Sequence, residues 1–152
     1  MREVVITGIG IISSLGNNIS EVTNSLRNLK SGISENIIND SKSTNFHSLS
    51  YALNETKNIF HSEYILIVCG DPAKEQNREI IIDGPKAIYI FGYHAQQINK
   101  CISHKNKYCF KNLEDVFECI QKNKFSQNIL FSPGYPSGRD YKDFNERGEA
   151  FN

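Results

Sequence analysis

Seven consecutive polar residues could bind an anion. They place hydroxyls, an ammonium group and two amides beside a carboxylate, in the order Asn39-Asp40-Ser41-Lys42-Ser43-Thr44-Asn45. The run follows the apolar pair Ile37-Ile38 and precedes a helix-like pattern. A loop between a strand and a helix directs such side chains, together with free backbone N–H groups, at an anionic ligand. The sequence therefore predicts an anion-binding loop here.

A second polar region near the C-terminus strengthens this interpretation. It reads Ser132-Pro133, then Ser137, Tyr141-Lys142-Asp143-Phe144, Arg147-Gly148-Glu149 and Phe151. Together the two regions resemble the C-terminal domain of the Mur ligases, and within that family the members that add D-glutamate to a peptidoglycan precursor. The resemblance covers roughly residues 36–152.

The resemblance implies a binding site for glutamate made by five residues. Thr44 would hydrogen-bond the α-carboxylate of the amino acid, and Lys74 would pair with it in a charge-assisted contact. Lys42 would face the phosphate side. Ser137 and Phe144 would hold the side-chain carboxylate, partly through backbone N–H groups. We assign no catalytic residue and no metal ligand.

Each of these residue types also has an ordinary structural role. Lone lysines such as Lys42 and Lys74 are usually solvated. Thr44 and Ser137 are types that often cap helices or form turns. Phe144 has helical spacing from Tyr141 and Gly148, which is typical of a core position. The four histidines show no metal-ligand spacing, so we assign them no role.

Three positions depart from the family pattern. The family lysine follows a G-G-x-x-K turn, which reads Gly70-Asp71-Pro72-Ala73-Lys74 here, so Asp71 brings a carboxylate close to the expected substrate carboxylates. Like charge weakens anion binding. Pro136 removes a backbone N–H donor, and Arg139 adds a charge. These departures predict weak binding of D-glutamate.

The chain contains no G-x-x-x-x-G-K-[ST] phosphate loop. In the resembled ligases, a central domain carries that loop and the magnesium ligands, and phosphoryl transfer depends on both. For this chain alone we expect no cofactor and no ATP hydrolysis, with ATP and Mg implied only for the full-length family. The first hypothesis is a fragment or fusion carrying the D-glutamate-binding domain. The alternative is a non-enzymatic interaction module, with a protein partner or self-association left open.

The first 33 residues resemble a different family, the β-ketoacyl-acyl carrier protein synthases. The resemblance lies in Val4–Asn17, which includes Thr7-Gly8-Ile9-Gly10, and in Lys30–Ile33. That family's cysteine and histidines lie far downstream of this segment, so we expect no condensing activity. A dinucleotide fingerprint would need glycine where Ser13 stands. We therefore divide the chain into a strand-helix segment at 1–35 and a ligase-like domain at 36–152.

Strand-like and helix-like runs alternate through residues 36–152. The clearest strands are Tyr64–Cys69, Ala87–Phe91 and Asn128–Phe131, because each is a short apolar run between helical patterns. Such alternation predicts an α/β, Rossmann-like domain of three layers, with helices on both faces of a parallel sheet. Functional loops then lie at the carboxyl ends of the strands.

Composition narrows the range of partners. The formal net charge is +0, which gives no global field to attract nucleic acid or an anionic membrane. No apolar run reaches about 18 residues, so we predict no membrane span. The four cysteines form no C-x-x-C pair, which favours buried reduced thiols in a cytoplasmic protein.

Overall fold

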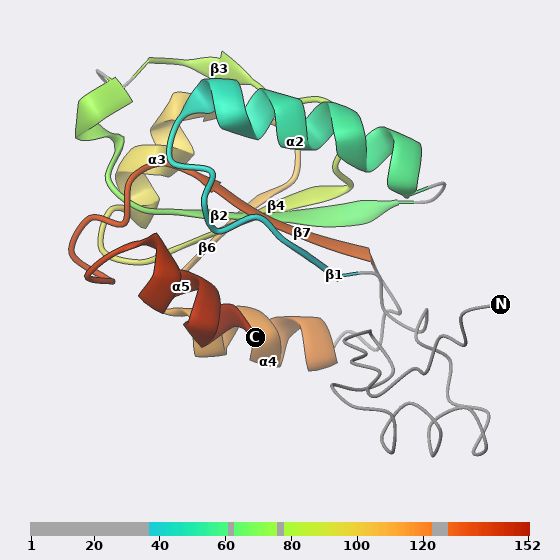
Figure 1. Cartoon of the computed structure of the whole chain (residues 1–152). Coiled ribbons are helices and arrows are strands. Elements are labelled where there is room, and N and C mark those ends of the chain that lie inside the picture. The colour runs from blue at the N-terminus through green and yellow to red at the C-terminus, as the bar shows by residue number, and fades with distance from the viewer. Residues whose placement is uncertain (1–36, 61–62, 76–77, 123–127) are drawn as a thin grey trace, which may run out of the picture. The chain divides into compact units, whose positions relative to one another are not determined.

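The computed structural model describes residues 37–60, 63–75, 78–122 and 128–152. A five-stranded sheet with the order β1-β7-β2-β4-β6 runs through this part of the chain (Figure 1). Every pairing in it is parallel. Its strands are β1 (Ile37–Asn39), β2 (Tyr64–Cys69), β4 (Ala87–Phe91), β6 (Lys107–Phe110) and β7 (Asn128–Gly134). The predicted α/β class and parallel sheet are confirmed, and the three predicted central strands share this sheet.

Helices cover both faces of the sheet, giving three layers (Figure 1). Residues of α2 (Phe46–Ile59) and α3 (Ala95–Cys101) belong to the core cluster on one face. Residues of α4 (Leu113–Lys122) and α5 (Phe144–Phe151) belong to the cluster on the other. A single turn of 3-10 helix, η1 (Pro72–Glu75), follows β2.

The sequence of β2 explains why the sheet is buried on both sides. All six of its residues are buried. Leu66 and Val68 belong to the cluster with α2 and α3, whereas Ile65, Ile67 and Cys69 belong to the cluster with α4 and α5. Side chains alternate between the two faces of a strand. A central parallel strand must therefore be apolar at every position, which is why this run was recognisable in the sequence.

Strand β7 extends beyond the predicted Asn128–Phe131 and ends at Gly134. It includes Pro133, which has no N–H to donate to a neighbouring strand and normally argues against a strand. The register between β2 and β7 shifts between Ile67 and Cys69, so that Cys69 pairs with Gly134. Such an irregularity accommodates a proline within a paired strand.

A second, two-stranded parallel sheet was not predicted. It pairs β3 (Ile80–Ile81) with β5 (Ile102–Ser103). Helix α3 ends at Cys101, because Ile102 already belongs to β5. Strands of two residues are too short to show an alternating pattern.

The predicted strand, helix and domain boundary within residues 1–35 lie outside the described residues and stay predictions. The four cysteines lie in the described part, where all are free and both Cys69 and Cys101 are buried. None of the helices described there is long and apolar enough to cross a membrane.

Candidate functional site

The parallel sheet brings all five predicted site residues to one edge. Lys42 and Thr44 lie in the loop after β1, and Lys74 lies on η1 after β2. Ser137 lies in the loop after β7, and Phe144 is the first residue of α5, which that loop reaches. Strands β1, β7 and β2 are neighbours in that order. The three loops therefore leave adjacent carboxyl ends, as the fold class predicts.

The structure bears on the helix-cap and core alternatives for three of the five residues. Asn45, not Thr44, caps α2 by accepting a hydrogen bond from the amide of Ser48 at 2.9 Å. Asp143, not Ser137, caps α5. Phe144 is 36 % exposed, so it is not a core residue. Lys42 and Lys74 are exposed, which fits either a site or a solvated surface.

The five predicted side chains do not bond to one another in this arrangement. Across the described residues, none of the five forms a hydrogen bond or ion pair with another of them. Lys42 lines a small hollow beside the start of α2, together with Asp40, Ser43, His47, Ser48 and Tyr51. The other four predicted residues do not line that hollow. The structure thus brings the loops together at one edge, and the binding role of their side chains stays a prediction.

The loop after β1 is fixed against β7 by its own backbone. The Asp40 amide donates to the carbonyl of Phe131 at 2.8 Å, and the Gly134 amide donates to the carbonyl of Ser43 at 3.0 Å. The Ser132 hydroxyl donates to the Asp40 carboxylate at 2.9 Å. Burial raises the pKa of Asp40, while that hydrogen bond and the charge of Arg147 lower it. These hydrogen bonds therefore hold in place the stretch of backbone that carries Lys42.

The loop after β2 is joined to the loop after β7. The Asp71 amide donates to the carbonyl of Pro136 at 2.9 Å. One oxygen of the Asp71 carboxylate accepts a hydrogen bond of 2.9 Å from the amide of Ala73, in the first turn of η1. Asp71 therefore lies at the carboxyl edge, where its predicted repulsion would act, and also shapes the turn that carries Lys74.

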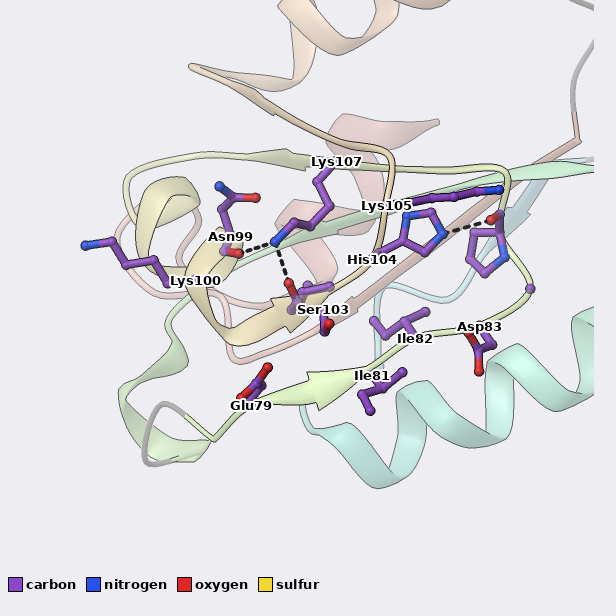
Figure 2. A pocket seen from close by; sticks show the side chains of 13 residues that line it. Glu79, Ile81, Ile82, Asp83, Asn99, Lys100, Ser103, His104, Lys105 and Lys107 are labelled. Carbon is purple, nitrogen blue, oxygen red and sulfur yellow. Dashed lines mark hydrogen bonds between the residues drawn. The ribbon is translucent and has the colours of Figure 1, made fainter.

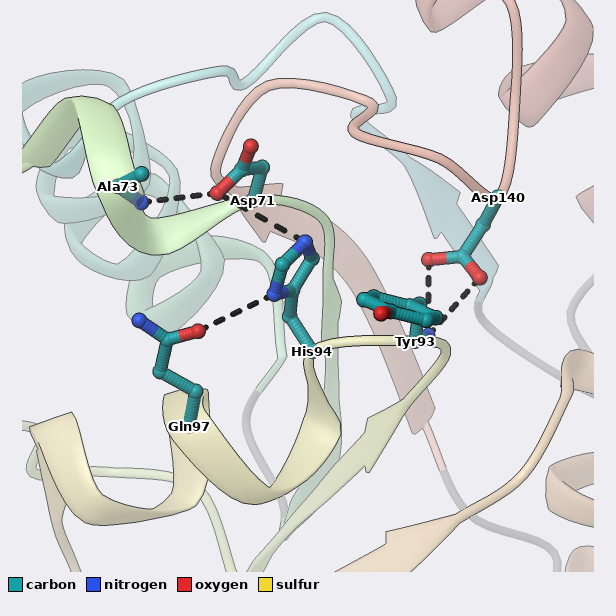
Figure 3. Close-up of polar contacts among 6 residues, drawn as sticks. All are labelled: Asp71, Ala73, Tyr93, His94, Gln97 and Asp140. Carbon is teal, nitrogen blue, oxygen red and sulfur yellow. Dashed lines mark hydrogen bonds and ion pairs between the residues drawn. The ribbon is translucent and has the colours of Figure 1, made fainter.

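Four further residues at this edge were not predicted from the sequence (Figure 3). His94, which follows β4, lies with its Nε2 3.9 Å from Oδ1 of Asp71. Its Nδ1 lies 3.1 Å from Oε1 of Gln97. The Asp140 carboxylate accepts from the amide of Tyr93 at 2.9 and 3.1 Å. These contacts join residues up to 47 positions apart, so spacing in the sequence gave no signal for them.

Groups of both charge signs lie at this edge. The Asp71 carboxylate faces the His94 imidazole at 3.9 Å. Arg139 lies over the ring of Tyr93, 4.7 Å from its centroid, and adds positive charge at the same edge. The edge therefore combines anion-attracting and anion-repelling groups.

A wider hollow lies at the opposite edge of the sheet (Figure 2). It is lined by residues before β4, among them Asp83, and by residues before and at the start of β6, among them His104 and Lys107. Nε2 of His104 lies 3.1 Å from the carbonyl of Pro85, and the Lys107 ammonium donates to the carbonyl of Asn99 at 2.6 Å. Both groups are engaged in holding the backbone, so this hollow is not our candidate site.

A bound metal has no evident set of ligands in the described part of the chain. No group of three or more histidine, cysteine, aspartate or glutamate side chains there could hold an ion.

Comparison with known proteins identifies relatives of one kind. No family model matches the chain. The UDP-N-acetylmuramoylalanine–D-glutamate ligase of Petrotoga mobilis is 35 % identical over 147 residues, covering 93 % of this chain and 33 % of that enzyme. The enzyme of the same name from Leptospira interrogans is 33 % identical, covering 80 % of this chain and 31 % of its own length.

A third relative of the same name, from Francisella tularensis, is 29 % identical and covers 98 % of this chain. Coverage of 93 % and 98 % means that these two matches extend into residues 1–35. The resemblance of residues 1–33 to ketoacyl synthases stays a prediction. The chain spans about a third of the length of the curated relatives that it matches, and over most of its own length it is similar to UDP-N-acetylmuramoylalanine–D-glutamate ligases.

Proposed function

We propose that residues 36–152 are the D-glutamate-binding domain of a peptidoglycan-precursor ligase. One observation carries the proposal: all five residues that match the family's glutamate site lie in the loops that follow the neighbouring strands β1, β7 and β2, or at the start of the helix that such a loop reaches. The relatives' names, which include D-glutamate, support the same choice of ligand.

In this proposal, two ends of the amino acid are held by different loops. Lys74 pairs with the α-carboxylate, and the Thr44 hydroxyl donates a hydrogen bond to it. Ser137 and the backbone at Phe144 hold the side-chain carboxylate. Lys42 faces the phosphate side, where another domain would supply ATP. The domain binds and orients glutamate, and the chemistry takes place on groups that this chain alone does not carry.

Calorimetric titration of the whole chain with D-glutamate, L-glutamate and ATP tests the proposal. We expect D-glutamate binding to the wild type to be undetectable or no tighter than millimolar, about 4 kcal/mol. We expect no binding of ATP and no magnesium-dependent phosphate release, because the chain has no phosphate loop. Replacing Lys74 by Met should remove the D-glutamate signal, whereas Lys100→Met, an exposed cation on α3, should not. Phosphate release that disappears in Lys42→Met would contradict the proposal.

A non-enzymatic interaction module is the second candidate, and one observation favours it. Tyr93 is 64 % exposed at the carboxyl edge, next to Arg139 and on the same edge as the exposed ring of Phe144. Tyrosine, phenylalanine and arginine are enriched in protein interfaces. No D-glutamate binding in the folded wild type, together with none in a variant that lacks the Asp71 charge, would favour this candidate.

A further inference from the structure

Arg147 is the least expected residue of the described core. It lies in α5 and is 0 % exposed, although arginine is almost never fully buried unless its charge is paired. Burial lowers the pKa of its guanidinium, but an arginine keeps its charge in a protein. Burying this charge costs free energy, so its contacts need an explanation.

The guanidinium is held by backbone carbonyls from two separate loops. Nη1 donates to the carbonyl of Tyr135 at 2.9 Å, and Nη2 donates to the carbonyl of Ser41 at 2.7 Å. In the described part of the chain, no carboxylate lies within the 4 Å of a salt bridge to Arg147. Its Nε has no partner among the described residues. The side chain therefore makes two directed bonds to backbone and also interacts with the buried Cys69 thiol, and it forms no ion pair within that distance.

These two carbonyls belong to residues that lie close in sequence to the residues proposed to bind the ligand. Ser41 directly precedes Lys42 in the loop after β1, and Tyr135 precedes Ser137 by two residues in the loop after β7. Along the chain Arg147 lies 106 positions from Ser41 and 12 from Tyr135. A guanidinium is planar and presents its N–H groups in a rigid fork, so it fixes two acceptors relative to each other.

The backbone at the next residue lets the fork reach both loops. Gly148 packs against Ser41 so closely that a β-carbon there would overlap the Ser41 hydroxyl. The Asn39 side chain donates to the Gly148 carbonyl at 3.0 Å. Helix α5 therefore packs directly against the loop after β1, and the Arg147 side chain bonds to the backbone of that loop.

We propose that Arg147 is the positioning residue of the carboxyl-edge site. Its guanidinium sets the arrangement of the loop that carries Lys42 and Thr44 relative to the loop that carries Ser137. It touches no ligand itself. The identity of the ligand rests on the proposed function, whereas the coupling of the two loops does not.

Hydrogen exchange of the intact chain tests the coupling, in the wild type, Arg147→Met and Arg147→Lys. We expect exchange in residues 40–45 and 135–138 to rise together by about tenfold in Arg147→Met, while exchange in Ala87–Phe91 stays unchanged. Arg147→Lys keeps the charge but not the fork, so it should raise exchange in at least one loop. The control Lys100→Met should leave both loops unchanged. A uniform rise over the whole domain, or a change in neither loop, would overturn the proposal.

A measurement on the wild type covers the case in which Arg147→Met does not fold. Two hydrogen bonds from different Nη atoms should hinder rotation of the guanidinium, giving separate, slowly exchanging Nη proton signals for Arg147 in nuclear magnetic resonance spectra. The exposed Arg139 should give averaged signals. Averaged signals for Arg147 would overturn the proposal.

Titration with D-glutamate adds a functional readout. If the wild type binds, Arg147→Lys should weaken binding by about tenfold at a temperature at which it remains folded. If neither the wild type nor a variant that lacks the Asp71 charge binds, the proposed ligand is wrong, and the exchange and resonance measurements still decide the role of Arg147.

Discussion

The amide of Asp71 donates a hydrogen bond of 2.9 Å to the carbonyl oxygen of Pro136, which joins the turn after β2 to the loop after β7. Gly70 makes this approach feasible. Its φ is +116°, in the region that favours glycine, and a β-carbon there would overlap the Pro136 oxygen. Two of the loops proposed to hold glutamate are therefore in contact only because position 70 has no side chain.

Replacing Gly70 by Ala should destabilise the domain by about 3 kcal/mol or more, because backbone strain and steric overlap add together. Gly84→Ala is the matched control: its φ is +115°, but the nearest atom to an added β-carbon is the Tyr64 hydroxyl at 3.1 Å. It should cost only the strain, roughly 1–3 kcal/mol. Urea unfolding measures both, and equal losses would show that the contact with Pro136 does not matter.

Removing the Asp71 charge should strengthen D-glutamate binding, since a carboxylate at this edge repels the ligand's carboxylates. Asp71→Asn is a cleaner test than Asp71→Gly, because asparagine keeps an oxygen that can accept from the Ala73 amide. Asp83→Asn, at the opposite edge of the sheet, serves as the control. Calorimetry that finds unchanged affinity in Asp71→Asn, with the structure intact, would contradict the repulsion.

Ser43 and Ser132 offer a matched test of buried hydroxyls. Both residues are buried, at 1 % and 0 % exposure. The Ser43 hydroxyl has no partner among the described residues, whereas the Ser132 hydroxyl donates to Asp40. Ser43→Ala should raise the free energy of unfolding by about 1 kcal/mol, and Ser132→Ala should lower it by roughly 1–3 kcal/mol. A loss of stability in Ser43→Ala would mean that its hydroxyl has a partner.

Asp143 should make the stability of the domain fall in acid. Backbone hydrogen bonds from Glu146, and then from Asn145, lower the pKa of this capping carboxylate below its usual value. A lowered pKa in the folded state contributes stability that is present above pH about 4 and lost as the pH falls through the folded-state pKa. Asp143→Asn keeps a cap but cannot titrate.

Unfolding measured between pH 6 and pH 2, in the wild type and in Asp143→Asn, checks this prediction. The stability of the wild type relative to the variant should decrease below pH about 4. A constant difference across that range would show that the cap makes no titrating contribution.

The parts of the fold that the sequence predicts are those in which each residue obeys a local rule. Tyr64–Cys69 and Ala87–Phe91 match their strands residue by residue, because central parallel strands are apolar at every position. Asn112 stands just before α4, and its side chain accepts from the amide of Asp115 at 2.9 Å. Capping depends on neighbours three residues away, so it is visible in sequence.

The parts that escaped prediction depend on contacts between distant segments. The sequence places Lys42 and Ser137 in candidate loops, but it does not show that Arg147 bonds to the backbone of both. The sequence also does not show that His94 lies near Asp71, because that contact depends on β2 and β4 being neighbours in the sheet. Tertiary packing also overrides the local rule at Pro133, which stays within β7 despite its missing N–H group.

The pairing of β1 with β7 sets an order on folding during synthesis. Ile37 pairs with Ile129, and the side chains of Asp40 and Ser132 bond across 92 positions. Contacts of such long range form slowly, because a large loop must close before they give any stabilisation. Strands β2, β4 and β6 leave the ribosome before β7 and can pair in part without it. Among the described strands, β1 pairs only with β7. It is synthesised before the other described strands, and it can join the sheet only after β7, the last of them, has been made.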